Sequence, residues 1–273
     1  MLGKLLKYPV DAWAVLLIAA TVAAQFALYF SGFGVVALIV GSALLLPARV
    51  SILAYNHNHI HVPTFRYRSL NRLLETAMFL QIGSSPLSGT LNHVFGHHAC
   101  YFRPEEDTLN WRRADRSSMG AHEFAIKAVA RHYLSCFDLA PRHARFGRNF
   151  YVYLALSIAI LLAIMVYDPV AGTIVFLVPM LMMLYLLKYS AYAHHSGLPI
   201  GDDFAASRTN TGRFYNWITW NAGYHAAHHL KQALHWSKLP AYHAELAPRI
   251  SADLQGRKWG THFAEHRRAP KSA

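Results

Sequence analysis

The sequence predicts an all-α integral membrane protein: four transmembrane helices in two hairpins, an interfacial helix, and a cytoplasmic helical cap. Of the 273 residues, 54% are hydrophobic and only 15% are charged, whereas about a quarter of a typical soluble domain is charged. The apolar residues form four long runs, and all 18 histidines lie outside these runs. We therefore expect one membrane-embedded domain over residues 1–273, with a polar, histidine-rich cap formed by residues 55–149 and 188–273.

The first hairpin is predicted from two apolar runs near the N-terminus. Residues 12–30 follow two lysines and approach the ~20 residues needed to span the hydrocarbon layer. A signal peptide is the alternative interpretation, although its apolar region would be shorter. The uncharged turn 31–34 leads into a second span over residues 35–54. Pro47 is expected to kink this span, and Arg49 is expected to reach the lipid head groups if this end is cytoplasmic.

The second hairpin is predicted from residues 150–167 and 170–187, two apolar runs joined by a short Asp-Pro turn. Each run is long enough for a short span. Residues 73–91 are only partly apolar and contain the sequence Gly-Ser-Ser-Pro, which does not suit a span. We expect this stretch to form an interfacial or re-entrant helix.

The distribution of basic residues predicts the orientation. The turns 31–34 and 168–169 contain no Lys or Arg, whereas the N-terminus, residues 62–149 and the C-terminal region are rich in both. By the positive-inside rule, both termini and the cap should lie in the cytoplasm, at a bacterial inner membrane. Lys and Arg outnumber Asp and Glu by 26 to 14. Without a nucleic-acid motif, this excess favours membrane lipid or an acidic protein partner.

Histidines recur at spacings that place several imidazoles on one face of a helix. A set at i, i+3 and i+4 can converge on one point, and neutral imidazole is a common ligand of iron, zinc and copper. One such set would equally suit a polar helix face, but repetition favours a metal centre. The histidine clusters are His57/His61, His93/His97/His98, His194/His195 and His225/His228/His229.

The number of candidate ligands bears on the metal. A single zinc ion uses about four ligands, so nine histidines suit two ions. An all-imidazole set suits iron, the metal that activates O2. His59 is not counted, because on a helix it points away from His57 and His61. The nine candidate ligands are His57, His61, His93, His97, His98, His195, His225, His228 and His229.

Three of these clusters resemble, in order, the three histidine boxes of the membrane-bound fatty acid desaturase and hydroxylase superfamily. The first box is His57/His61, the second is His93/His97/His98 and the third is His225/His228/His229. Residues 93–107, which end in Pro-Glu-Glu-Asp, are similar to the second box of alkane monooxygenases. Residues 191–198 are similar to the segment that carries an extra ligand in those enzymes, which implies His195 here. Residues 208–240 look more like the desaturases. Asn58 stands where desaturases usually have an acidic residue, which leaves the exact reaction open.

The resemblance implies two non-haem iron ions that reduce O2 with electrons from a separate ferredoxin, rubredoxin or cytochrome b5-like protein. It also implies an apolar lipid substrate that enters from the bilayer and loses hydrogen from an unactivated C–H bond. We expect a lipid (fatty acyl) desaturase. The alternative is a hydroxylase or monooxygenase that acts on an alkane, fatty acyl or other lipid chain, since both reactions use the same ligands. A carotenoid oxygenase is a weaker alternative.

Four further residues are expected to hydrogen-bond the ligands rather than the metal. Asn221 lies one helical turn before His225 and so should face the same cluster, although it could equally cap the start of the helix. Glu106 and Asp107 are expected to orient imidazoles, with a solvated acidic loop as the alternative. By the resemblance, His194 takes the place of an acidic residue and should orient a ligand. Its alternative is a solvent-facing position at a helix exit.

A metal-ion transporter belongs to a different functional class. Transporters place ionisable residues along a path near the membrane midplane. The four predicted spans contain no His, Asp or Glu. The sequence therefore favours an enzyme over a transporter.

Overall fold

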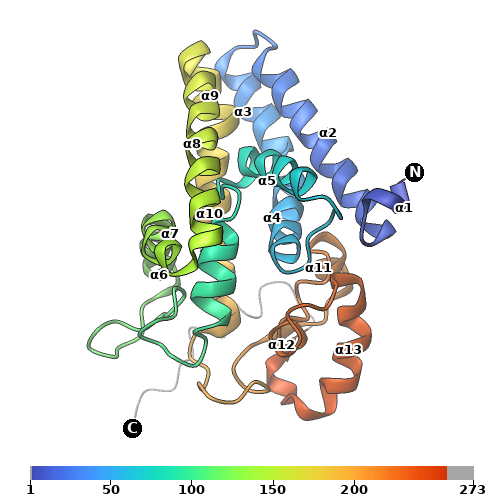
Figure 1. The fold of residues 1–273 in the computed structure, drawn as a ribbon, viewed down its shortest axis with the longest axis vertical. Coiled ribbons are helices and arrows are strands. Elements are labelled where there is room, and N and C mark those ends of the chain that lie inside the picture. The colour runs from blue at the N-terminus through green and yellow to red at the C-terminus, as the bar shows by residue number, and fades with distance from the viewer. Residues whose placement is uncertain (1, 257–273) are drawn as a thin grey trace.

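The computed structural model describes residues 2–256, so the end of the predicted cap, residues 257–273, lies outside them. The described chain is mostly helical (Figure 1). Its α-helices are α1 (Leu2–Leu5), α2 (Ala12–Tyr29), α3 (Val35–Leu44), α4 (Leu46–His61), α5 (Arg68–Ile82), α6 (Ala121–Ala130), α7 (His132–Leu139), α8 (Ala144–Tyr167), α9 (Pro169–Gly172), α10 (Val178–His195), α11 (Arg213–Ile218), α12 (His225–Leu230) and α13 (Leu239–Leu246). The same residues include the π-helices η2 (Thr90–His98) and η4 (Thr173–Leu177), and a parallel pair of short strands, β1 (Thr209–Asn210) and β2 (Gln255–Gly256).

The membrane-spanning helices can be counted by length and composition. In the described chain, three helical stretches are long and apolar enough to cross a membrane: Pro9–Tyr29, His132–Tyr167 and Pro169–His195. A fourth crossing exists if α3 and α4 together form one span, bent by 46° at the break between them. Pro47 lies at the start of α4, where its missing N–H and its ring interrupt the helix, in agreement with the predicted kink. The chain thus has three candidate spans, or four if the bent pair is one.

Two of these helices extend beyond their apolar runs. The second and fourth runs end near residues 54 and 187, but α4 continues to His61 and α10 to His195. Polar residues at the end of a run mark the exit from the apolar layer, and they do not end the helix. The histidines at both helix ends are therefore carried on rigid extensions of the spanning helices.

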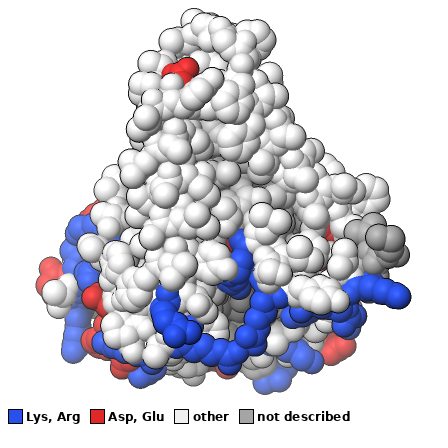
Figure 2. All heavy atoms as spheres, turned by 45° about the horizontal axis from the view of Figure 1, so that its top comes forward, with Lys and Arg blue, Asp and Glu red and all other residues white. Residues whose placement is uncertain are grey.

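The outer surface of the bundle suits a lipid environment. Large apolar side chains point outward on three helices, where Leu16 is 60%, Val36 is 76% and Val166 is 84% exposed. An exposed apolar surface of this extent is typical of a protein that contacts lipid. Figure 2 shows that one end of the molecule carries hardly any charged groups, whereas Lys and Arg gather around the other end.

Arg49 lies inside the bundle and not at the lipid head groups, so that prediction is wrong. Its side chain is fully buried. Its Nη2 donates to the carbonyl of Val175 at 2.8 Å, and its Nε donates to Oε1 of Gln81 at 3.2 Å. Gln25 donates to the same Val175 carbonyl at 3.1 Å. These hydrogen bonds offset the cost of burying a cation and tie α2, α4 and α5 to η4.

The partly apolar segment differs from the expected helix over residues 73–91. Helix α5 ends at Ile82, because Gly83 adopts a left-handed conformation with φ +74°. Glycine suits this position, since an added Cβ would lie only 3.1 Å from the carbonyl oxygen of Met180. In Figure 1, α5 runs across the bundle. The chain resumes helical structure in η2, which carries the second histidine box.

The C-terminal helices are held against the bundle by contacts from distant parts of the chain. Trp220 donates from Nε1 to the carbonyl of Ser51 at 3.1 Å, and Asn58 donates to the carbonyl of Trp220 at 3.0 Å. Asp11, which is buried, accepts hydrogen bonds from His235 Nε2 at 3.0 Å and from Trp236 at 2.8 Å. These contacts fix α12 beside the ends of α4 and α10.

Candidate metal centre

The histidine-bearing segments meet at the end of the bundle, where α4, η2, α10 and α12 enclose a small space. Their histidines are far apart in the sequence, yet their ring nitrogens face one another. Within the described chain, eight histidines form two groups that could each hold a metal ion. The first group is His57, His61, His93, His98 and His228, and the second is His97, His195 and His229.

The first group draws on three segments of the chain, α4, η2 and α12, with its candidate ligand atoms all within 4.8 Å of one another. The Nε2 atoms of His57 and His93 are 2.9 Å apart, and those of His93 and His98 are 3.0 Å apart. His228 Nε2 lies 3.1 Å from His98 Nε2, across 130 residues of sequence. The five rings therefore converge on one point.

The second group lies next to the first. His97 and His195 place their Nε2 atoms 3.3 Å apart. His225 belongs to neither group, yet its Nε2 is 2.9 Å from that of His195 and 3.2 Å from that of His229. The structure thus brings all nine predicted ligands together, five on one side and four on the other.

The π-helix η2 determines how the second box is divided between the groups. Its wider turn bonds residues five apart, as in the hydrogen bond from Ala99 N to the carbonyl of Val94 at 3.1 Å. His93 and His98 consequently face the same point, while His97 faces the other. The sequence interpretation assumed ordinary helical spacing, in which His93 and His97 would share a face.

The nitrogen geometry fits a metal ion. Metal–imidazole bonds of about 2.0–2.1 Å place neighbouring ligand nitrogens at about 3 Å, close to the separations found here. His61 Nε2 is buried and has no hydrogen-bond partner among the described residues. An unpartnered buried nitrogen is costly unless something binds its lone pair. The donor set therefore suits a metal such as iron, which imidazole ligates well.

The electrostatics keep these imidazoles neutral. Burial lowers the pKa of His93, His98 and His228 well below the ordinary histidine value. Burial likewise lowers the pKa of His225 and His229. A neutral imidazole offers a lone pair, whereas an imidazolium cannot bind a metal. The rings are therefore ready to act as ligands at neutral pH.

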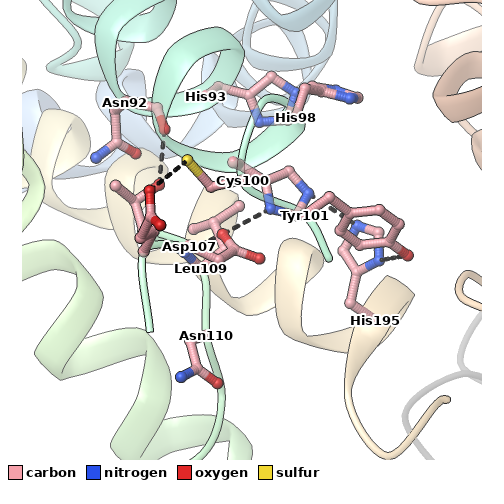
Figure 3. A network of polar contacts seen from close by, with 12 residues as sticks. Asn92, His93, His98, Cys100, Tyr101, Asp107, Leu109, Asn110 and His195 are labelled. Carbon is pink, nitrogen blue, oxygen red and sulfur yellow. Dashed lines mark hydrogen bonds and ion pairs between the residues drawn. The ribbon is translucent and has the colours of Figure 1, made fainter. Parts of the chain in front are cut away.

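Asp107 and Tyr101 contact the outer nitrogens of two of these rings (Figure 3). His97 donates from Nδ1 to Oδ1 of Asp107 at 2.8 Å, and both side chains are buried. His195 Nδ1 lies 3.0 Å from the Tyr101 hydroxyl and 3.2 Å from the carbonyl of Ala206. Such contacts fix the tautomer and direct Nε2 toward the centre of the histidine group. The sequence predicted Asp107 but missed Tyr101, whose signal is its position four residues after His97.

His194 is buried and does not face solvent, so the solvent-facing alternative is wrong. Its Nδ1 lies 3.0 Å from the carbonyl of Arg208, and its ring stacks on that of His225, with centroids 4.1 Å apart. His194 thus supports the position of His225. His195, next to it, turns toward His97 and His225.

Two of the predicted supporting residues do not reach the ligands. Helix α12 begins only at His225, and Asn221 lies before it with φ +61°. The Asn221 side chain donates to the carbonyl of Trp236 at 3.1 Å, so the assumed helical turn between Asn221 and His225 is wrong. Glu106 forms an exposed ion pair with Arg103 at 2.9 Å. Neither contact orients an imidazole of the two groups.

His59 points away from the other histidines of its helix, as the sequence predicted. Its Nε2 lies 3.1 Å from Oε1 of Glu75, and its Nδ1 lies 2.8 Å from the hydroxyl of Thr64. Both His59 and Glu75 are buried. His59 therefore joins α4 to α5 and takes no part in the groups of ligands.

A cavity of about 340 Å³ lies against both groups of histidines. This volume is within the range of small-molecule sites. Most of its lining comes from α4, η2 and α10, and this lining includes Lys188 of α10. Its apolar lining includes Val50, Leu53, Leu186 and Leu187.

Comparison with known families bears on this site. A family model described as fatty acid desaturase matches residues 33–259. This range is well over half of the 273-residue chain and contains all four histidine-bearing segments. A search of curated proteins finds no match.

Proposed function

The chain belongs to the fatty acid desaturase family, and on this basis we propose that it is an O2-dependent di-iron desaturase of a lipid acyl chain. The observation that carries the proposal is the pair of adjacent imidazole groups beside an apolar cavity. Iron bound there would reduce O2 and remove hydrogen from an unactivated C–H bond of the lipid. The family and the apolar helices support an oxidoreductase of the membrane.

We assign nine histidines to the two metal ions. One ion is held by the five-histidine group, and the other by the three-histidine group together with His225. Asp107 and Tyr101 orient His97 and His195 through their outer nitrogens. The proposed ligands are His57, His61, His93, His98 and His228 for the first ion, and His97, His195, His225 and His229 for the second.

The rest of the site positions the substrate. The apolar lining of the cavity holds an alkyl chain against the histidines and excludes bulk water. A C–H bond held next to the ligands is in place for hydrogen removal. Loss of a second hydrogen from the neighbouring carbon gives the alkene.

The electrons come from a separate protein. The net charge of +12 and the gathering of Lys and Arg at the end of the bundle favour an acidic ferredoxin, rubredoxin or cytochrome b5-like donor. By the positive-inside rule this end faces the cytoplasm of a bacterial cell, with both termini on the same side.

A lipid hydroxylase or monooxygenase is the second candidate. The hydrogen bond between Asp107 and His97 lies in the segment that is similar to the second box of alkane monooxygenases. The same ligands serve both reactions. The two differ only in whether oxygen is added to the carbon that has lost hydrogen.

The test combines metal analysis with product analysis. Protein purified from iron-rich medium should contain about two iron ions per chain, because nine imidazoles exceed the needs of one ion. Cells that express the protein under labelled O2 should accumulate lipids with a new double bond and no label. A His57→Ala variant is the inactive control.

Each outcome has a clear meaning. A labelled hydroxyl group in the product would identify the protein as a hydroxylase. Stoichiometric zinc, with activity that survives removal of iron, would exclude the di-iron assignment.

A further inference from the structure

One wall of the cavity carries buried polar side chains that the metal centre does not use. Lys188 on α10 and His132 at the start of α7 both line the cavity, and each is only 2% exposed. Asn92, which precedes the second histidine box, lines it as well. A lysine is almost never fully buried unless it is paired. We therefore expect these side chains to contact the molecule that occupies the cavity.

Lys188 is a buried cation with a neutral partner. Its Nζ donates to Oδ1 of Asn92 at 2.7 Å. An ammonium group has three donors. Among the described residues, no carboxylate lies within ion-pair distance of Lys188. Its hydrogen bond within this part of the chain is the one to Asn92. Burying a cation without an ion-pair partner is unfavourable, so a negatively charged group that reached Lys188 would be bound favourably.

His132 adds an unmet donor to the same wall. Both of its ring nitrogens are buried and have no hydrogen-bond partner among residues 2–256. One of the two nitrogens carries a proton in either tautomer. An unpartnered buried donor costs free energy that a ligand oxygen would recover. The same kind of group, an oxygen that accepts hydrogen bonds, would therefore satisfy both His132 and Lys188.

The position of this wall relates it to the reactive site. Lys188 precedes His195 on α10 by about two helical turns, or ~10 Å along the axis. Asn92 is next to His93 in η2. The polar wall and the imidazole groups therefore belong to one cavity, and a single elongated molecule can contact both.

We propose that Lys188 and His132 bind the carboxylate of the substrate inside the cavity, so that the enzyme acts on an unesterified carboxylated lipid. A carboxylate supplies the missing negative charge and accepts from both the ammonium and the imidazole N–H. An ester keeps the oxygen atoms and lacks the charge, while a hydrocarbon leaves both donors unsatisfied. This assignment rests on the proposed function, in which the cavity holds the substrate.

Binding measurements test the assignment without turnover. The ligands are dodecanoic acid and methyl dodecanoate, titrated into the purified full-length protein in a non-ionic detergent and corrected for uptake by empty micelles. Wild-type protein should bind the acid about tenfold to a hundredfold more tightly than the ester, the usual range for hydrogen bonds to a charged group. Equal affinity for acid and ester would overturn the proposal.

Variants locate the preference. Lys188→Met should bind acid and ester about equally, and His132→Phe should lose part of the preference. Lys127→Met is the matched control, because Lys127 is exposed and pairs with Glu123 at 2.8 Å. It should keep the wild-type preference. Iron content and thermal melting of each variant show whether the fold and metal centre are intact.

Other outcomes would contradict the assignment. A Lys188→Met protein that keeps the acid preference but loses turnover would assign Lys188 to proton delivery. A protein that contains no iron and oxidises no lipid would refute the proposed function, while the acid–ester comparison would still decide whether the wall binds a carboxylate.

Discussion

At the residue scale, two adjacent histidines on the last turn of α10 make different kinds of contact. His195 directs Nε2 toward His97 and His225, at 3.3 and 2.9 Å. His194 stacks on the ring of His225 and contacts the carbonyl of Arg208. Neighbouring residues on a helix point about 100° apart, which is why the two cannot serve one ion as equals.

The first prediction separates these two residues. His195→Ala should lose bound iron and all activity, because it removes a ligand. His194→Ala should keep iron and lose activity by ~10–100-fold, the usual effect of removing a group that orients a ligand. Iron content by mass spectrometry and turnover with a lipid substrate measure both effects. Iron lost from the His194 variant but kept in the His195 variant would reverse the assignment.

The consecutive residues Glu106 and Asp107 also differ in what their carboxylates contact. Asp107 is buried and accepts from His97 Nδ1, whereas Glu106 pairs with Arg103 at the surface. The sequence could not distinguish them, since both end the same Pro-Glu-Glu-Asp stretch. Their roles depend on which of the two side chains the loop turns inward.

The second prediction uses Glu106 as the control for Asp107. Asp107→Ala should weaken iron binding by ~10–100-fold, because His97 loses the acceptor that fixes its tautomer. Glu106→Ala should bind iron like the wild type, since an exposed ion pair contributes little. Titration of the metal-free proteins with Fe(II) compares the affinities. Equal losses in both variants would show that the loop acts only through its overall charge.

At the element scale, the π-helix η2 and the loop after it form one unit. Thr108 donates from its hydroxyl to the carbonyl of Asn92 at 2.7 Å and from its backbone N to the carbonyl of Gly96 at 3.0 Å. An added Cβ on Gly96 would lie 2.5 Å from the methyl carbon of Thr108. The absence of a side chain at Gly96 therefore allows the loop with Asp107 to pack against the histidine box.

The third prediction concerns this close approach. Gly96→Ala should destabilise the protein by about 1–3 kcal/mol, as overpacking does, and should lower iron content because Asp107 moves with Thr108. Gly120→Ala is the control, since no atom lies within 4 Å of its added Cβ. It should change stability by less than ~0.5 kcal/mol. Thermal melting in detergent measures both; identical melting curves would mean that η2 tolerates the methyl group.

The long helices explain how a polar centre is held beside an apolar layer. Helices α4 and α10 run out of their apolar stretches and end in histidines, at His61 and His195. Buried contacts along their length, such as Ile52 and Met183 in one cluster, fix their relative position. These candidate ligands are thus placed by rigid helices and not by loops, which favours a fixed geometry.

At the scale of the whole molecule, charge separates the two ends. One end of the bundle carries hardly any charged groups, and the end near the histidines is surrounded by Lys and Arg (Figure 2). The chain as a whole has a net charge of +12. This asymmetry suits a protein that enters lipid at one end and meets an acidic partner at the other.

The fourth prediction follows from this asymmetry. Turnover with an acidic ferredoxin should fall by about tenfold when salt rises from 0.05 to 0.5 M, because added ions screen the attraction that brings the two proteins together. Turnover with a small chemical reductant should change little and is the control. A ferredoxin-driven rate that is independent of salt would remove the electrostatic basis for the partner.

The sequence by itself determined the features that depend on local periodicity. Long apolar runs indicated helices for a membrane, and the spacing within His57–His61 separated two candidate ligands from His59, because a helix repeats every 3.6 residues. The nine candidate ligands also came from spacing and resemblance. Their role as ligands stays a prediction, although the structure brings them together.

Only the tertiary structure decided which groups meet, because such contacts join residues far apart in the chain. His98 and His228 are 130 positions apart, and Lys188 and Asn92 are 96 positions apart. Local rules also failed where the backbone departs from regular geometry: η2 widens to a π-helix, and Asn221 has positive φ. The side chain of Asn221 donates to the carbonyl of Trp236, and a spacing rule that assumes regular helical geometry cannot anticipate such a contact.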